Sequence, residues 1–89
     1  MIRRHYQITG EVQHVGFRWR ARKAASLFSC TGWCRNEPDG SVILELQGGR
    51  IPILLVLLAI RASRRIRITH MKVTRREPIP EEREFRSVY

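Results

Sequence analysis

The chain has 89 residues, enough for one modest hydrophobic core, so a second independent domain is excluded and we expect a single domain over residues 1–89. Hydrophobic residues make up 43% and charged residues 28%, which excludes a disordered tail and is typical of a globular protein. The net charge of +9 favours an anionic partner, such as nucleic acid, an acidic membrane surface or a phosphorylated substrate, although a solvated basic surface accounts equally well for most of the arginines.

The sequence shows neither a targeting signal nor a membrane span, so a soluble, cytoplasmic protein is the default expectation. The N-terminal residues carry charges with no apolar segment behind them, so no signal peptide is expected. The longest apolar run, which begins at Ile51 and ends at Ile60, is shorter than the roughly 20 residues that a membrane-spanning helix needs. Cys30 and Cys34 lie too far apart on one extended segment for a disulfide and offer no metal-site spacing, so we expect two reduced, packed thiols.

The first half of the chain predicts a strand, a helix and a hairpin. Alternation in RHYQITG, residues 4–10, predicts a strand with Tyr6 and Ile8 on one face. The following helix is predicted from apolar residues that recur at helical spacing, namely Phe17, Ala21, Ala24, Ala25 and Phe28. CTGWCRN, residues 30–36, and SVILELQ, residues 41–47, then predict two strands joined by the turn EPDG.

The second half predicts a helix and two further strands. Pro52 fits the first turn of a helix that runs through Arg61 or a little beyond. A strand is expected over residues 66–76, and the tail, residues 82–89, fits a short edge strand with Phe85 turned inward. The order β-α-β-β-α-β predicts an α+β fold, a ferredoxin-like sandwich in which an antiparallel sheet carries two helices on one face.

The stretch GEVQHVGFR, residues 10–18, joins the first strand to the first helix and has the features of an anion site. Glycine lets the backbone approach an oxyanion closely, and the unpaired N–H groups at a helix N-terminus point toward it. Arg18 lies in the first helical turn, where its guanidinium could fold back over the loop. From spacing alone, a plain strand-to-helix turn with a surface arginine remains the alternative.

Two motifs carry a family resemblance. GEVQHVGFR closely resembles the acylphosphatase signature G-x-V-Q-G-V-G-F-R, and GWCRNEPDGSV resembles the family's second block, in which G-W-V-x-N precedes a turn and Asp-Gly-Ser-Val. The two blocks stand in the family's order, separated by one amphipathic helix, and the resemblance is firm over residues 3–48. After that it is weaker, with apolar spacing kept at Ile68, Met71 and Val73.

The resemblance implies a fold, an activity and a site. The fold is the one that the pattern predicts, and the activity is metal-free hydrolysis of the carboxyl-phosphate bond of small acyl phosphates, with no cofactor. Arg18 carries over as the clamp on the substrate phosphate, and Asn36 as the residue that orients the attacking water. The phosphate cradle would be formed by the backbone amides of the loop, at Gln13, His14, Val15, Gly16 and Phe17.

The sequence departs from the family at two places. His14 replaces the usual glycine, which would strain the loop if the backbone there needs a positive φ; it could also place a titratable ring beside the phosphate, or be tolerated surface variation. The second helix is apolar all round from Ile53 to Ile60, so it would expose leucines and favour a homo-oligomer, unless the segment is partly strand.

Two other function classes are weighed against the enzyme. One is a non-catalytic acylphosphatase-like domain that binds phosphorylated metabolites or a protein partner. The other is a nucleic-acid-binding module, for which the net charge of +9 argues but against which SVILELQ, with no aromatic residue for stacking, argues more strongly. We therefore expect a small acyl phosphate as the partner, with neither nucleic acid nor a membrane.

Overall fold

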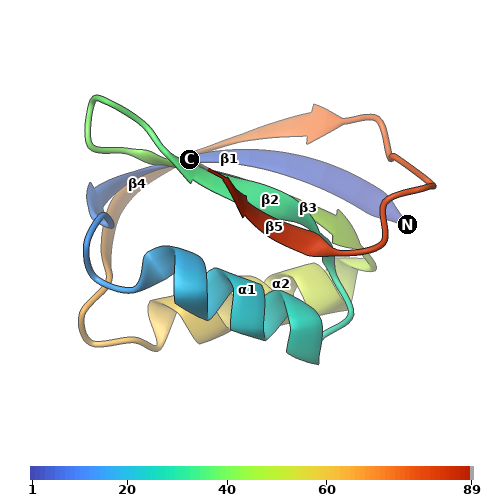
Figure 1. Cartoon of the computed structure of the whole chain (residues 1–89), viewed down its shortest axis with the longest axis horizontal. Coiled ribbons are helices and arrows are strands. Elements are labelled where there is room, and N and C mark those ends of the chain that lie inside the picture. Colours follow the sequence, from blue (N-terminus) through green and yellow to red (C-terminus); the bar gives the residue numbers. More distant parts are fainter. Residues whose placement is uncertain (89) are drawn as a thin grey trace.

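The computed structural model describes residues 1–88, which form a five-stranded sheet with two helices packed against one face (Figure 1). The elements in chain order are β1 (Ile2–Glu11), α1 (Phe17–Leu27), β2 (Thr31–Asn36), β3 (Val42–Gly48), α2 (Arg50–Arg61), β4 (Arg67–Arg76) and β5 (Phe85–Val88). The strands lie in the order β4-β1-β3-β2-β5. This architecture confirms the predicted ferredoxin-like sandwich, and the expected tail strand forms one edge of the sheet; its last predicted residue, Tyr89, lies outside the described residues.

One strand pair departs from the antiparallel sheet that the sequence predicts. The pairs β1–β3, β1–β4 and β2–β3 are antiparallel, but β5 pairs with β2 in parallel. The cause is the connection of residues 77–84, which crosses one end of the sheet from one edge to the other and reverses the chain (Figure 1). Because β5 therefore runs opposite to β4, it runs in the same direction as β2.

The core lies between the sheet and the two helices. Helix α1 buries most of the predicted face, at Phe17, Ala21, Ala24 and Ala25, while Phe28 caps the helix and is partly buried. Helix α2 buries Ile53, Val56 and Ile60. Each large apolar side chain taken from water in this way stabilises the fold by roughly 1.5–3 kcal/mol.

The outward face of α2 is apolar, as the sequence predicts. Ile51 is 64% exposed, and Leu54, Leu55 and Leu58 are 49%, 36% and 53% exposed. The segment is helical from Arg50 to Arg61, so the alternative of a partial strand is wrong. No helix within residues 1–88 has the length and apolar character to cross a membrane.

The connection of residues 77–84 is fastened to the helix-free face of the sheet by buried polar groups. Arg3 is only 3% exposed, and its guanidinium donates to both carboxylate oxygens of Glu82, at 2.8 and 3.1 Å. Gln47 makes two bonds with the backbone of Ile79, donating to its carbonyl at 2.8 Å and accepting from its N–H at 2.6 Å. These contacts hold the segment that leads directly into β5.

Glu45 is the second carboxylate of this network. It accepts a hydrogen bond from Nε of Arg3 and lies 2.6 Å from Nδ1 of His5. Burial raises the pKa of Glu45, but the hydrogen bonds to His5 and Arg3 outweigh burial and hold that pKa below its usual value. The charged form of Glu45 is therefore part of the folded state.

Candidate active site

The loop between β1 and α1 ends in an uncapped helix N-terminus. Gly16 is the N-cap residue, with φ 80° and ψ 19°, and its carbonyl accepts the first helical hydrogen bond from Arg20 N–H at 3.0 Å. No side chain caps the helix, and its first turn holds no acidic residue. The first N–H groups of α1 and its positive dipole end are thus available to an anion.

Two positions of this loop, His14 and Gly16, adopt positive φ. The φ of His14 is 60°, which lies in the left-handed region that favours glycine. Because histidine has a β-carbon, the backbone at this position is under some strain. At Gly16 an added Cβ would meet no atom within 4 Å, so the glycine is required by its φ of 80° and not by crowding. The loop therefore curls with open space above it.

Gln13 joins this loop to the turn between β2 and β3. Its side-chain amide donates to the carbonyls of Glu37 and Ser41, at 2.7 and 2.9 Å. The turn is further fixed by Asp39, whose carboxylate accepts from the N–H and the hydroxyl of Ser41, at 2.9 and 2.6 Å. Since Asn36 is the last residue of β2 before this turn, these bonds set its position relative to the loop.

A cavity of about 200 Å³ opens at this junction. Its lining residues are Val12, His14, Gly16, Phe17, Arg18, Trp19 and Asn36. The two residues that the family resemblance singles out for catalysis, Arg18 from α1 and Asn36 from β2, therefore meet in one small cavity. Of the predicted cradle, Gln13 and Val15 do not line it: Gln13 holds the turn, and Val15 packs partly buried against the core.

Arg18 lies between this cavity and the last strand. Its Nη1 donates to the backbone carbonyl of Val88 at 3.5 Å. It also lies near the buried thiol of Cys34: burial raises the pKa of Cys34 to about 11 and outweighs the hydrogen bond with Ser87 and the positive charge of Arg18, which both lower it. Cys30 and Cys34 are both free and buried, as predicted, and a thiol with so high a pKa is a poor nucleophile.

Asn36 carries a buried acceptor that the protein does not satisfy. Its Oδ1 is buried and has no hydrogen-bond partner among residues 1–88. A buried carbonyl oxygen left in this state costs about 1–3 kcal/mol. Such a group at the wall of a cavity is suited to accept a hydrogen bond from a small bound molecule.

Two residues of the cavity lining were not expected from the sequence. Val12 is the valine of the G-x-V-Q part of the signature, and its side chain is buried in the core, only 1% exposed. Trp19 follows Arg18 and is 64% exposed, which is high for so large an apolar side chain. The sequence did contain a signal, because Trp19 falls off the apolar face of the predicted helix.

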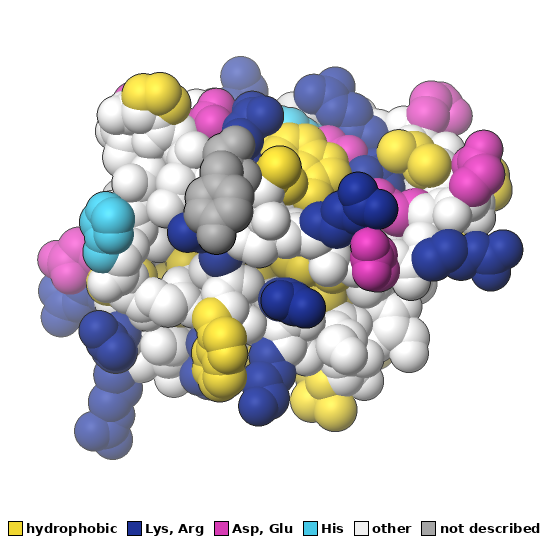
Figure 2. Space-filling view, viewed as in Figure 1, with side chains coloured by type: hydrophobic (Ala, Val, Ile, Leu, Met, Phe, Trp, Pro, Cys, Tyr) yellow, Lys and Arg dark blue, Asp and Glu magenta, His cyan; other side chains and the backbone are white. Residues whose placement is uncertain are grey.

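Outside this cavity, the described surface is rich in basic side chains (Figure 2). Lys and Arg side chains are spread widely over the face in Figure 2, in agreement with the net charge of +9.

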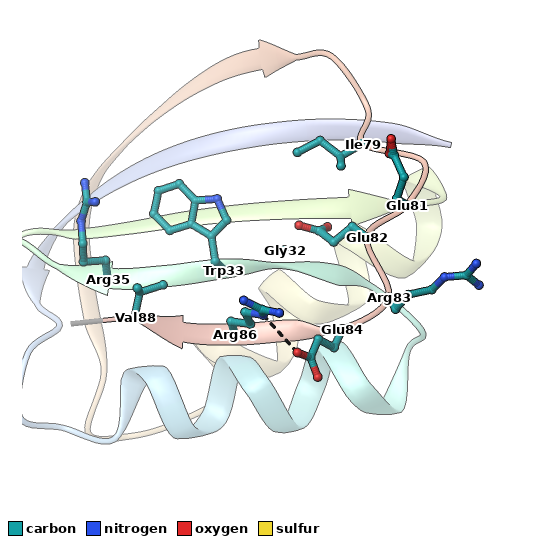
Figure 3. A pocket seen from close by; sticks show the side chains of 10 residues that line it. All are labelled: Gly32, Trp33, Arg35, Ile79, Glu81, Glu82, Arg83, Glu84, Arg86 and Val88. Carbon is teal, nitrogen blue, oxygen red and sulfur yellow. Dashed lines mark hydrogen bonds and ion pairs between the residues drawn. The ribbon is translucent and has the colours of Figure 1, made fainter.

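A larger cavity, of about 630 Å³, lies on the helix-free side of the sheet, where Trp33 rises from β2 and Ile79 and Glu82 stand at the far end (Figure 3). No group of three or more His, Cys, Asp or Glu side chains within residues 1–88 is arranged to hold a metal ion.

Comparison with known proteins connects these features. The family model described as Acylphosphatase matches residues 4–87. An acylphosphatase of Geobacillus thermodenitrificans is 36% identical over 100% of this chain and 96% of its own length, and one of Chlorobaculum tepidum is 43% identical over 92% of this chain and 90% of its own. The crystal structure of acylphosphatase from Bacillus subtilis superposes with a TM-score of 0.89 at 27% identity, covering 100% of both chains.

Proposed function

Since the chain belongs to the acylphosphatase family, we propose that it hydrolyses the carboxyl-phosphate bond of small acyl phosphates to a carboxylate and phosphate. The observation that carries this proposal is the single cavity of about 200 Å³ in which Arg18, Asn36 and the uncapped start of α1 meet. An acyl phosphate has a good leaving group, so the protein needs only to hold the phosphoryl group, offset its charge and aim a water molecule.

Arg18 is the proposed phosphate clamp. Its guanidinium is permanently charged and presents two parallel N–H groups, which match two phosphate oxygens. The contact of its Nη1 with the Val88 carbonyl, at 3.5 Å, supports a defined orientation of the side chain at the cavity.

The loop of residues 13–17 is the proposed phosphate-binding loop. Of the predicted cradle of Gln13, His14, Val15, Gly16 and Phe17, the three residues that line the cavity, His14, Gly16 and Phe17, would offer their backbone amides to the phosphate oxygens directly. Gln13 and Val15 belong to the same loop without lining the cavity, and their amides would complete the cradle. The positive φ of His14 and Gly16 supports a curled backbone at this point, and the absence of an acidic residue in the first turn of α1 leaves its dipole unopposed.

Asn36 is the proposed guide for the attacking water. Its unpaired Oδ1 would accept a hydrogen bond from the water, which then attacks phosphorus opposite the acyl oxygen. The phosphorus–oxygen bond to the acyl group breaks as the new bond forms, the carboxylate leaves with the electron pair, and the proton of the water passes to solvent. This sequence uses neither a metal ion nor a cofactor.

The alternative is a non-catalytic domain that binds phosphorylated metabolites or a protein partner, and the histidine in the loop is the observation that favours it. Phosphate release from acetyl phosphate, measured together with inhibition by inorganic phosphate, separates the two. The enzyme releases phosphate and is inhibited by it. A protein that binds inorganic phosphate but releases none from acetyl phosphate is the binding domain.

We also propose that the chain acts as one domain, residues 1–89, in the cytoplasm. Its two free buried thiols support this location, because the cytosol keeps thiols reduced. Its partners would be a small acyl phosphate and a second copy of itself, with neither nucleic acid nor a membrane. The apolar outward stripe of α2 supports self-association, although Ile60, inside the run, is 1% exposed and faces the core.

Self-association is tested by light scattering at micromolar concentration. We expect a homodimer for the parent and a monomer for a variant that carries Leu54→Glu and Leu58→Glu, because both leucines are about half exposed, at 49% and 53%. A parent that stays monomeric over this range would show that the stripe does not mediate pairing.

A further inference from the structure

Trp19 stands at the mouth of the candidate active site. It lines the same cavity as Arg18 and Asn36, and it also lines a neighbouring groove of about 440 Å³ on the outward side of α1. The other residues of that groove, Arg22, Lys23, Ser26 and Leu27, all belong to α1. The indole is therefore the wall that the cavity and the groove share.

Among the apolar side chains of the cavity, Trp19 is the one that offers surface to a ligand. Phe17 and Val12 are only 2% and 1% exposed, since they belong to the core, whereas Trp19 is 64% exposed. The ring is also restricted, because Nζ of Lys23 lies 4.9 Å from its centroid, in a cation–π contact. A large apolar surface held in this way loses little conformational freedom when a ligand packs on it.

The proposed phosphate site decides which end of a substrate reaches this surface. Arg18 and the loop of residues 13–17 would hold the phosphate, so the acyl group must point out of a cavity of only about 200 Å³. A methyl group is too small to cover the exposed indole, whereas a planar ring stacks on it and removes apolar surface of both partners from water.

We propose that Trp19 selects the acyl group, and that the chain prefers acyl phosphates whose acyl group is flat and apolar. This inference rests on the proposed hydrolysis and names the substrate class of that same site. Its simplest probe is benzoyl phosphate, with acetyl phosphate as the reference that has the same reacting bond and no ring.

The test compares kcat/KM for the two substrates in the parent and in variants. We expect the benzoyl-to-acetyl ratio to fall about tenfold in Trp19→Ala, as the loss of one aromatic stacking contact implies. Trp19→Phe retains a ring and should keep most of the preference. Trp33→Ala is the matched control, because Trp33 lies on the helix-free side of the sheet, in the pocket of Figure 3, and it should leave the ratio at the parent value.

The outcomes separate the two proposals. Hydrolysis of both substrates with an equal ratio in the parent and in Trp19→Ala would overturn the role of Trp19 and leave the proposed function standing. An equal fall of the ratio in Trp33→Ala would also overturn it, since the effect would then be general. A parent that hydrolyses neither substrate would refute the proposed function itself.

Discussion

Replacing Asn36 by alanine should move activity and stability in different directions. The Oδ1 atom is buried without a partner among the described residues, which costs about 1–3 kcal/mol. Removing the oxygen relieves this destabilisation. The packing energy lost with the side chain is smaller, because Asn36 is only partly buried. We therefore expect Asn36→Ala to unfold with a free energy equal to or above that of the parent, by up to about 1 kcal/mol.

Turnover should fall steeply in the same variant. Loss of one hydrogen-bonding group that acts on the transition state typically lowers kcat by about 10²–10³. Because Asn36 is proposed to act on the water and Arg18 on the phosphate, inhibition by inorganic phosphate should survive in Asn36→Ala.

The assay combines three measurements on the parent and the variant: kcat for acetyl phosphate, the inhibition constant of inorganic phosphate, and the midpoint of thermal unfolding. Arg35→Ala is the matched control, because Arg35 precedes Asn36 on β2, is 43% exposed and pairs with Glu37 at 2.8 Å. It should change none of the three appreciably. If phosphate inhibition weakens in Asn36→Ala as much as turnover falls, Asn36 is a binding group and the proposed role is wrong.

Three further substitutions and one thiol-labelling measurement test other features of the site and the fold. Arg18→Ala should weaken phosphate inhibition by about 30- to 150-fold, from the loss of about 2–3 kcal/mol of charge-assisted bonding, with native circular dichroism; unaltered inhibition would refute the clamp. His14→Gly should keep or raise activity, because glycine adopts φ 60° without strain, and a steep loss would show that the imidazole participates. The pKa of Glu45 is lowered in the folded state, so its charge stabilises the fold above about pH 4.3, and this stabilisation is lost as the pH falls through the lowered pKa. In Glu45→Gln the free energy of unfolding should therefore fall less steeply as the pH is lowered into the acid range. An acid dependence identical to that of the parent would contradict the network. Cys34, with a pKa of about 11, should react with thiol reagents only after denaturation, and rapid reaction of the native protein would contradict its burial.

The fold was predictable because its signals are local and agree with one another. Alternation around Tyr6 and Ile8 and the helical spacing from Phe17 to Phe28 each specify an element and its buried face. The direction of β5 was not predictable in this way. It depends on how residues 77–84 cross the sheet. The hydrogen bonds that hold this segment link Gln47 to Ile79, which are 32 residues apart in the sequence, and Arg3 to Glu82, which are 79 residues apart.

The candidate site was predictable in part. Arg18 and Asn36 meet as the two motifs imply, and the positive φ of His14 follows the glycine that the signature usually has there. The sequence did not predict that the side chain of Gln13 would turn to the β2–β3 turn, nor that Trp19 would wall the cavity. Both depend on which way a side chain points across two segments that only the folded chain brings together.

Phosphate release from acetyl phosphate in the presence of EDTA is the most direct test of the proposed activity. Parent and Arg18→Ala protein would be treated with the chelator and assayed side by side. We expect the parent to release phosphate at the same rate with and without EDTA, and Arg18→Ala to release almost none while remaining folded. A parent that releases no phosphate, or whose release disappears with EDTA, would contradict metal-free hydrolysis at this site.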